Sequence, residues 1–190
     1  MTSISIIGAG NMGKALSELF HRAGAEVQLI GHEVAPGNIE GEIVVLAVPY
    51  PALADVVSVF GTQLDGRIVV DITTPVDFAT FDPIKPTAGS ATAELATALP
   101  KSHLVKAFNT NFAATLATGT VNSAPISVMV AGDDAEAKKV LTEVVAASGA
   151  ETFDLGGLAR ATELEAFGYL QIALAASEQI TWMNGFVLNK

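Results

Sequence analysis

Three glycines near the N-terminus have the spacing of a phosphate-binding loop. Gly8, Gly10 and Gly13 follow a short apolar run and open a segment with helical periodicity. In such a loop the first glycine permits a tight turn, the second lets the backbone approach a pyrophosphate, and the third lets the helix pack closely against the strand. Asn11 and Met12 stand at the helix N-terminus, where unpaired N–H groups and the helix dipole favour phosphate. The spacing therefore predicts a dinucleotide site rather than a purely structural turn.

The residues after the second predicted strand bear on the choice between NADP and NAD, and they leave it open. Gly31 leaves room for a 2′-phosphate, and His32 is the only basic side chain nearby. Glu33 lies about 20 residues past the glycine loop, where an acid would bind the ribose 2′-hydroxyl of NAD. A third interpretation is that His32 and Glu33 are simply exposed loop residues.

Three further predicted strands end in segments rich in proline, threonine and asparagine, namely 48–51, 71–75 and 106–111. Ligands bind beyond the carboxyl ends of the strands in open α/β sheets, so these segments are expected to line the site. Thr73, Thr74, Asn109 and Thr110 can offer amide and hydroxyl contacts to a carboxamide or a substrate, although these residue types are also common in turns and helix caps. Lys106, inside the fifth strand, is interpreted as a buried or ion-paired structural lysine.

No side chains have the spacing of an acid–base pair or a metal site, so we assign no catalytic and no metal-binding residue. His21 and His103 are predicted on a helix face and at the start of a strand, away from the carboxyl edge. The absence of cysteine excludes disulfides, thiol nucleophiles and thiolate metal sites. Hydride transfer between two redox rings needs mainly positioning, because the cofactors carry the chemistry.

The composition restricts the partners. A formal charge of −10 without a basic run argues against nucleic acid and anionic membranes as partners. No uninterrupted apolar stretch reaches the length of a membrane span, and no leader is recognised, so we expect a soluble, cytoplasmic protein. Half of the residues are hydrophobic, which favours a second subunit covering part of the surface.

The chain alternates short β-branched runs with helical patterns, which predicts an α/β fold of the Rossmann type with a doubly wound parallel sheet. We expect strands at 3–7, 27–30, 43–48, 68–72, 104–108, 126–131 and 151–154. We expect helices at 11–23, 51–60, 90–99, 134–147 and 158–184. Between strands two and three, residues 31–42 are too few for the helix that a dinucleotide fold usually has there. Residues 1–156 are assigned to the dinucleotide-binding domain, and 157–190 to a C-terminal helical extension.

The apolar side chains of the extension have two interpretations. At mixed helical spacing they could line a substrate pocket, but such a stripe is more often core or subunit interface. We favour a dimer interface, with Trp182, Met183 and Phe186 at the mouth of the site. The stripe comprises Leu164, Phe167, Leu170, Ile172, Leu174 and Ile180.

Segments 8–16, 44–50 and 105–110 together resemble the NADPH-dependent coenzyme F420 reductase family, and the order and spacing fit almost the whole chain. The resemblance implies a Rossmann domain that binds NADP(H), a small helical C-terminal portion and a homodimer. The implied reaction is hydride exchange between nicotinamide and a deazaflavin or flavin-like acceptor such as coenzyme F420. The residues implied to line the nicotinamide side are Val48, Pro49, Tyr50 and Thr74, with Asn109 close by.

One departure and two alternatives accompany the resemblance. NADP-binding members usually continue the second strand with Gly-Ser-Arg, whereas this chain has Gly31-His32-Glu33, so NAD stays an alternative cofactor. The related β-hydroxyacid dehydrogenases need a lysine on the long helix, and residues 158–189 contain none. The second alternative is a dinucleotide-binding sensor or scaffold without turnover.

Overall fold

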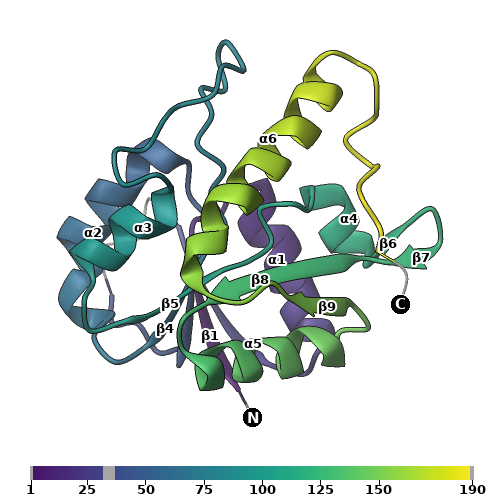
Figure 1. The fold of residues 1–190 in the computed structure, drawn as a ribbon. Helices are drawn as coiled ribbons and strands as arrows, with labels where there is room; N and C mark the ends of the chain where they lie inside the picture. Colours follow the sequence, from purple (N-terminus) through teal and green to yellow (C-terminus); the bar gives the residue numbers. More distant parts are fainter. Residues whose placement is uncertain (1, 32–36, 189–190) are drawn as a thin grey trace.

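The computed structural model describes residues 2–31 and 37–188 and contains a seven-stranded sheet (Figure 1). The strand order is β2-β1-β3-β4-β5-β8-β9, so β2 flanks β1 on one side and the later strands extend the sheet on the other. The predicted Rossmann-type fold class is confirmed. The strands are β1 (Ser3–Ile7), β2 (Glu26–Ile30), β3 (Ile43–Leu46), β4 (Ile68–Asp71), β5 (His103–Lys106), β8 (Ser127–Gly132) and β9 (Glu151–Asp154).

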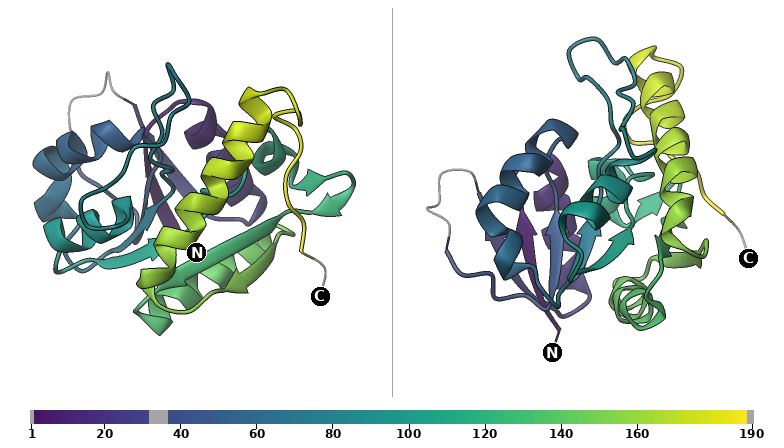
Figure 2. Two further views of the ribbon diagram at one scale, coloured as in Figure 1. Left: turned by 45° about the horizontal axis from the view of Figure 1, so that its top comes forward. Right: turned by 60° about the vertical axis from the view of Figure 1, so that its left-hand side comes forward.

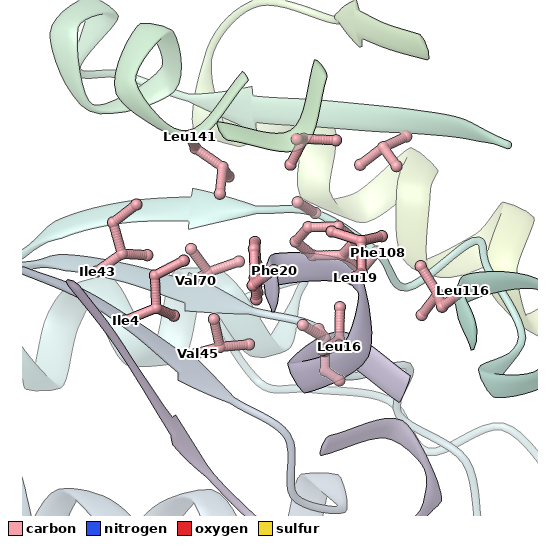
Figure 3. Close-up of a cluster of buried hydrophobic side chains, with 14 of the residues drawn as sticks. Ile4, Leu16, Leu19, Phe20, Ile43, Val45, Val70, Phe108, Leu116 and Leu141 are labelled. Atoms are coloured by element: carbon pink, nitrogen blue, oxygen red, sulfur yellow. The ribbon is translucent and has the colours of Figure 1, made fainter. Parts of the chain in front are cut away.

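Two helical layers enclose this sheet. Helices α1 (Asn11–Arg22), α4 (Ala113–Thr118) and α5 (Ala135–Ala147) contribute to one core cluster, drawn in Figure 3, while α2 (Leu53–Phe60) and α3 (Ala91–Ala98) contribute to the other. Strands β3 and β4 are buried along their whole length, as expected for parallel strands covered on both faces. Helix α6 (Ala161–Ala176) and the loop between β4 and α3 project on the same side of the sheet (Figures 1 and 2).

The direction of the last two strands corrects the prediction of an all-parallel sheet. Strand β8 pairs antiparallel with β5, and β9 pairs parallel with β8. Only the short α4 and the hairpin of β6 (Thr120–Val121) and β7 (Ala124–Pro125) separate β5 from β8. These elements do not carry the chain back to the end of the sheet where β5 begins. Strand β8 therefore starts near the end of β5 and runs in the opposite direction. Neither α4 nor the hairpin was predicted.

The segment between β2 and β3 has no helix in its described part, residues 37–42, and side chains hold it in place instead. The Gln28 amide accepts from the Glu40 N–H at 3.1 Å and donates to the Asn38 carbonyl at 3.0 Å. The Arg67 guanidinium donates to the carbonyls of Ile39, at 3.0 Å, and Gly41. Hydrogen bonds from side chains, rather than a helix, therefore hold residues 38–41 beside β2.

The helix predicted over 158–184 is too long. A short 3₁₀ turn at Leu158–Arg160 precedes α6, and α6 ends at Ala176. Beyond it the Gln179 N–H donates to the Leu174 carbonyl at 2.9 Å, and Glu178 has a left-handed φ of 59°. This turn stops the helix without the glycine that usually marks a helix end. Across the described ranges, no helix is both long and apolar enough to cross a membrane.

Candidate active site

The glycine loop has the geometry that its sequence predicts. Gly8 has a φ of +116°, and its N–H donates to the Ile30 carbonyl at 2.8 Å. A Cβ at Gly8 would lie 2.2 Å from the Ala47 carbonyl oxygen, and one at Gly13 would lie 1.8 Å from that of Gly8. Both positions therefore require glycine for the strand, the loop and α1 to meet closely.

Gly10 differs from Gly8 and Gly13 because no other atoms pack against it. A Cβ at Gly10 would meet no atom within 4 Å among the described residues. Gly10 is the N-cap of α1, and no side chain caps this helix, whereas Ser90 caps α3 and Asp134 caps α5. The first turn of α1 also contains no acid. The N-terminus of α1 thus has free N–H groups and a positive dipole end that an anion could bind.

A cavity of about 550 Å³ lies beside this helix N-terminus, beyond the carboxyl ends of β4 and β5. None of its lining residues is charged, and its polar side chains are amides and one hydroxyl. The lining residues are Asn11, Met12, Ile72, Thr74, Phe78, Asn109, Asn111, Phe112, Ala113, Ala114, Ile172 and Trp182. Such a largely apolar pocket with a few polar groups is typical of small-molecule sites.

Aromatic rings form one side of the cavity. The ring centroids of Phe112 and Trp182 are 4.9 Å apart, and those of Phe81 and Trp182 are 6.4 Å apart. Trp182 therefore lies at the cavity, where the sequence interpretation put it. Met183 and Phe186 are not among the lining residues, and Phe186 packs on Phe167 with centroids 4.5 Å apart.

The backbone at the end of β5 makes an uncommon turn. Phe108 has a left-handed φ of 61°, and the Asn109 N–H donates to the Ala107 carbonyl at 2.8 Å, which closes a three-residue γ-turn. The Phe108 side chain is fully buried and packs edge-to-face on Phe20. Strained turns of this kind persist only where packing enforces them, and they concentrate at functional sites. This turn brings Asn109 to the cavity.

The Asn109 amide is oriented by α6. Its Nδ2 donates to the Leu164 carbonyl at 2.7 Å. Its Oδ1 is buried and accepts no hydrogen bond from any residue that the structure describes. Thr74 lies next to it, with its hydroxyl 3.4 Å from the Asn109 carbonyl. The structure thus brings Asn11, Met12, Thr74 and Asn109 together at one cavity.

Behind the cavity lies a fully buried lysine, as the sequence interpretation of Lys106 expected. Its Nζ donates to Asp71 at 2.8 Å, to the Thr73 carbonyl at 2.5 Å and to Glu165 at 2.9 Å. Thr92 donates a further hydrogen bond to Asp71 at 2.7 Å. Burial raises the pKa of the Glu165 carboxyl above its ordinary value, although Lys106 opposes the shift.

The other predicted site residues that the structure describes are absent from the lining of this cavity. Val48 and Pro49 follow β3, and Val48 would be 3.2 Å from a Cβ on Gly8. The Tyr50 hydroxyl donates to Glu94 at 2.8 Å, and burial followed by this hydrogen bond raises the Tyr50 pKa to about 12. Tyr50 lines a separate groove of about 400 Å³ between α2 and α3. Gly31 begins the connection between β2 and β3, and His32 and Glu33 lie outside the described residues.

Sequence reasoning missed several residues that the structure brings to the site. Phe112 lines the cavity, and Glu165 and Gly168 attach α6 behind it. A signal existed for the residues of α6. Glu165 falls on the buried face of α6 together with Gln171, and acidic or amide side chains within such a face indicate a buried polar contact.

Comparison with known proteins places this geometry in a family. The F420-dependent NADP reductase of Methanocaldococcus jannaschii is 30% identical over 173 residues, covering 87% of this chain and 76% of the relative. No family model matches the chain.

Solved structures share the fold. A crystal structure from Arthrobacter sp. FB24, proposed to be an F420-dependent NADP reductase, superposes with a TM-score of 0.84, 21% identity and full coverage of both chains. A hypothetical protein from Sinorhizobium meliloti gives a TM-score of 0.70 and 30% identity, covering 84% of this chain and 87% of that one.

The fold and the glycine loop, together with these relatives, define an enzyme of the NAD(P)H-dependent oxidoreductase class. Within that class, the chain belongs to the F420-dependent NADP reductase family.

Proposed function

We propose that this protein exchanges a hydride between NADP(H) and a deazaflavin or flavin-like acceptor. The observation that carries the proposal is the position of the cavity. It opens at the uncapped N-terminus of α1 and continues between the ends of β4 and β5 to an aromatic side. A dinucleotide phosphate and a planar redox ring can therefore be held side by side.

The cofactor would be held by the glycine loop and the strand ends. Gly8 and Gly13 shape the loop, Gly10 leaves space for the pyrophosphate, and the N–H groups at Asn11 and Met12 face it. We propose Thr74 and Asn109 for the nicotinamide side, because both line the cavity. When bound, NADPH supplies the hydride and leaves as NADP⁺, while the acceptor takes up the hydride and a proton from solvent.

We propose NADP rather than NAD as the preferred cofactor. The support is the relative from Methanocaldococcus jannaschii, which is named an NADP reductase. Contacts of Gly31 and His32 with the 2′-phosphate, and of Val48, Pro49 and Tyr50 with the nicotinamide side, stay predictions.

The acceptor is proposed from the chemistry of the cavity lining. Phe78, Phe112 and Trp182 line the cavity with aromatic rings, and no lining side chain is charged. Aromatic surfaces of this kind favour a flat, uncharged ring over a hydrated ion. The test is NADPH oxidation, followed at constant cofactor, with a deazaflavin, a flavin, a quinone and a ferric chelate. We expect turnover with the first two, and turnover with the ferric chelate alone would contradict the proposed acceptor.

A sensor or scaffold without turnover is the second candidate. The observation that favours it is the absence of any titratable side chain among the residues that line the cavity. Hydride transfer needs no such group from the protein, so we rank the enzyme first. NADPH binding without oxidation across the whole acceptor panel would reverse this order.

We also propose that the extension, residues 157–190, contributes a homodimer contact. Several of its apolar side chains are exposed, among them Leu170, Leu174, Met183 and Phe186. Several exposed apolar side chains on one short segment favour a subunit contact. The assignment of 157–190 as a unit separate from 1–156 stays a prediction.

A further inference from the structure

Helix α6 is attached to the ends of β4 and β5 by an ion pair that water does not reach. The side chains of Lys106 and Asp71 have no exposed surface, and that of Glu165 is 7% exposed. Asp71 and Lys106 are register partners on β4 and β5, so the lysine is fixed to the sheet before it meets the helix. The second Glu165 oxygen accepts from the Ala91 N–H at 3.1 Å, which also ties α6 to the start of α3.

Two more contacts hold the same stretch of α6 at the same strand ends. Leu164, next to Glu165, accepts the hydrogen bond from the Asn109 amide. Gly168 lies one turn further on, and a Cβ there would be 2.7 Å from the Asn109 carbonyl oxygen and 2.8 Å from the Thr74 hydroxyl. The backbone of α6 therefore sets where Asn109 and Thr74 lie at the cavity.

A buried ion pair fixes geometry more firmly than a surface pair. Separating α6 from β5 would leave Lys106 and two carboxylates without compensation in a site closed to water, which is strongly unfavourable. Partial displacement of the helix is therefore disfavoured along with full separation. We propose that Lys106 and Glu165 are positioning residues, which hold α6 on the strand ends and thereby fix the Asn109 amide and the Thr74 hydroxyl for the nicotinamide. The functional part of this inference rests on the proposed function.

Neither residue is placed to act on the substrate itself. Lys106 and Glu165 are absent from the lining of the cavity, and the hydrogen bonds of Lys106 all go to protein acceptors. Their effect on the reaction runs through Asn109 and Thr74. The inference therefore predicts a loss of turnover without a matching loss of cofactor affinity, since the glycine loop lies on other elements.

The test uses Glu165→Ala, with Glu163→Ala as the matched control. Both glutamates lie on α6, but the Glu163 side chain is 59% exposed and pairs only with Arg160 among the described residues. The first readout is the pair of side-chain amide resonances of Asn109 in the apo protein, which does not depend on any activity. We expect them to move or broaden in Glu165→Ala and to stay in place in Glu163→Ala.

The second readout separates turnover from binding. We expect kcat of NADPH oxidation to fall about tenfold or more in Glu165→Ala, because small displacements of reacting groups have large effects on rate. We expect the Kd for NADPH to change by less than about threefold, because the glycine loop that would hold the pyrophosphate lies between β1 and α1, away from Glu165. Glu165→Gln keeps an oxygen that can accept from Lys106, so it should recover most of the lost turnover.

Several results would overturn the inference. One is an unchanged Asn109 resonance pair, or an unchanged kcat, in a folded Glu165→Ala. If that variant does not fold, Gly168→Ala decides, because it displaces α6 at the same place and keeps every charge. It should give the same split between kcat and Kd, and wild-type values for both would contradict the positioning role. A wild-type protein that binds no NADPH would instead refute the proposed function, and the resonance readout would still test the positioning.

Discussion

At the scale of single residues, the three loop glycines have different reasons to be glycine. Gly8 and Gly13 are required by packing, since a Cβ on either would overlap a backbone carbonyl. Gly10 faces open space, so the protein itself does not require glycine there, whereas a bound pyrophosphate would. Substitution by alanine can therefore separate the folding role from the binding role within one loop.

We predict that Gly10→Ala leaves the free energy of unfolding within about 0.5 kcal/mol of the wild type, as for other substitutions without contacts. It should weaken NADPH binding about tenfold or more, because the methyl group occupies the space of the pyrophosphate. Gly13→Ala should instead destabilise the fold by about 1–3 kcal/mol through overpacking. Denaturant unfolding and titration calorimetry measure the two quantities. Wild-type affinity in Gly10→Ala would show that Gly10 does not face the cofactor.

The buried carboxyl of Glu165 gives the protein a pH-dependent contribution to stability. Its pKa in the folded protein is raised above the ordinary value of 4.5, chiefly by burial. The folded state then binds the proton more tightly than the unfolded state, so stability falls as the pH rises from 4.5 through the raised pKa. Glu165→Gln removes this contribution. We expect the free energy of unfolding of the variant to fall less than that of the wild type between pH 4.5 and 7, and parallel curves would refute the assignment.

At the scale of elements, the sequence pattern predicted the helices and strands that interactions between nearby residues determine. Strand β1, the loop and α1 follow from adjacent residues, and their observed bounds match the predicted ones within a residue. The direction of β8 and the end of α6 depend on contacts distant in sequence or on a turn without glycine or proline. The sequence pattern contains no signal for these, because strand direction follows from where the preceding elements leave the chain.

Helix α3 illustrates an element whose start depends on one side chain. Ser90 is buried at the N-cap, and its hydroxyl accepts from the Ala93 N–H at 3.1 Å. We predict that Ser90→Ala lowers the free energy of unfolding by about 1 kcal/mol, the usual value of an N-cap. Thr97→Ala, at an exposed position of the same helix, should not lower it, because alanine has the higher helix propensity. Equal losses in the two variants would argue against the cap.

At the scale of the whole molecule, the candidate site was only partly predictable. Asn11, Met12, Thr74 and Asn109 were found because each follows a strand or opens the first helix, and the carboxyl ends of neighbouring parallel strands share one edge. The contributions of Phe112 and Gly168 come from the connection between β5 and α4 and from α6. Their meeting depends on how α6 packs, which the apolar pattern of the extension did not specify.

The exposed apolar side chains of the extension predict that the protein forms a dimer. Leu170 is 58% exposed on α6, and Leu174, one turn further on, is 38% exposed. We predict a dimer at micromolar concentration in sedimentation velocity, because apolar surface of this kind is usually covered by a partner. Leu170→Glu should give folded monomers, because a buried charge in the contact is unfavourable. A monomeric wild-type protein would contradict the proposed contact.

The most direct test of the central claim is titration calorimetry of the purified protein with NADPH and NADH in parallel, with Gly10→Ala as the loop control. We predict that NADPH binds more tightly than NADH and that the variant binds NADPH about tenfold or more weakly than the wild type. Tighter NADH binding would mean that the cofactor preference of the family is reversed in this chain. If neither dinucleotide binds, the glycine loop is structural and the proposed function is wrong.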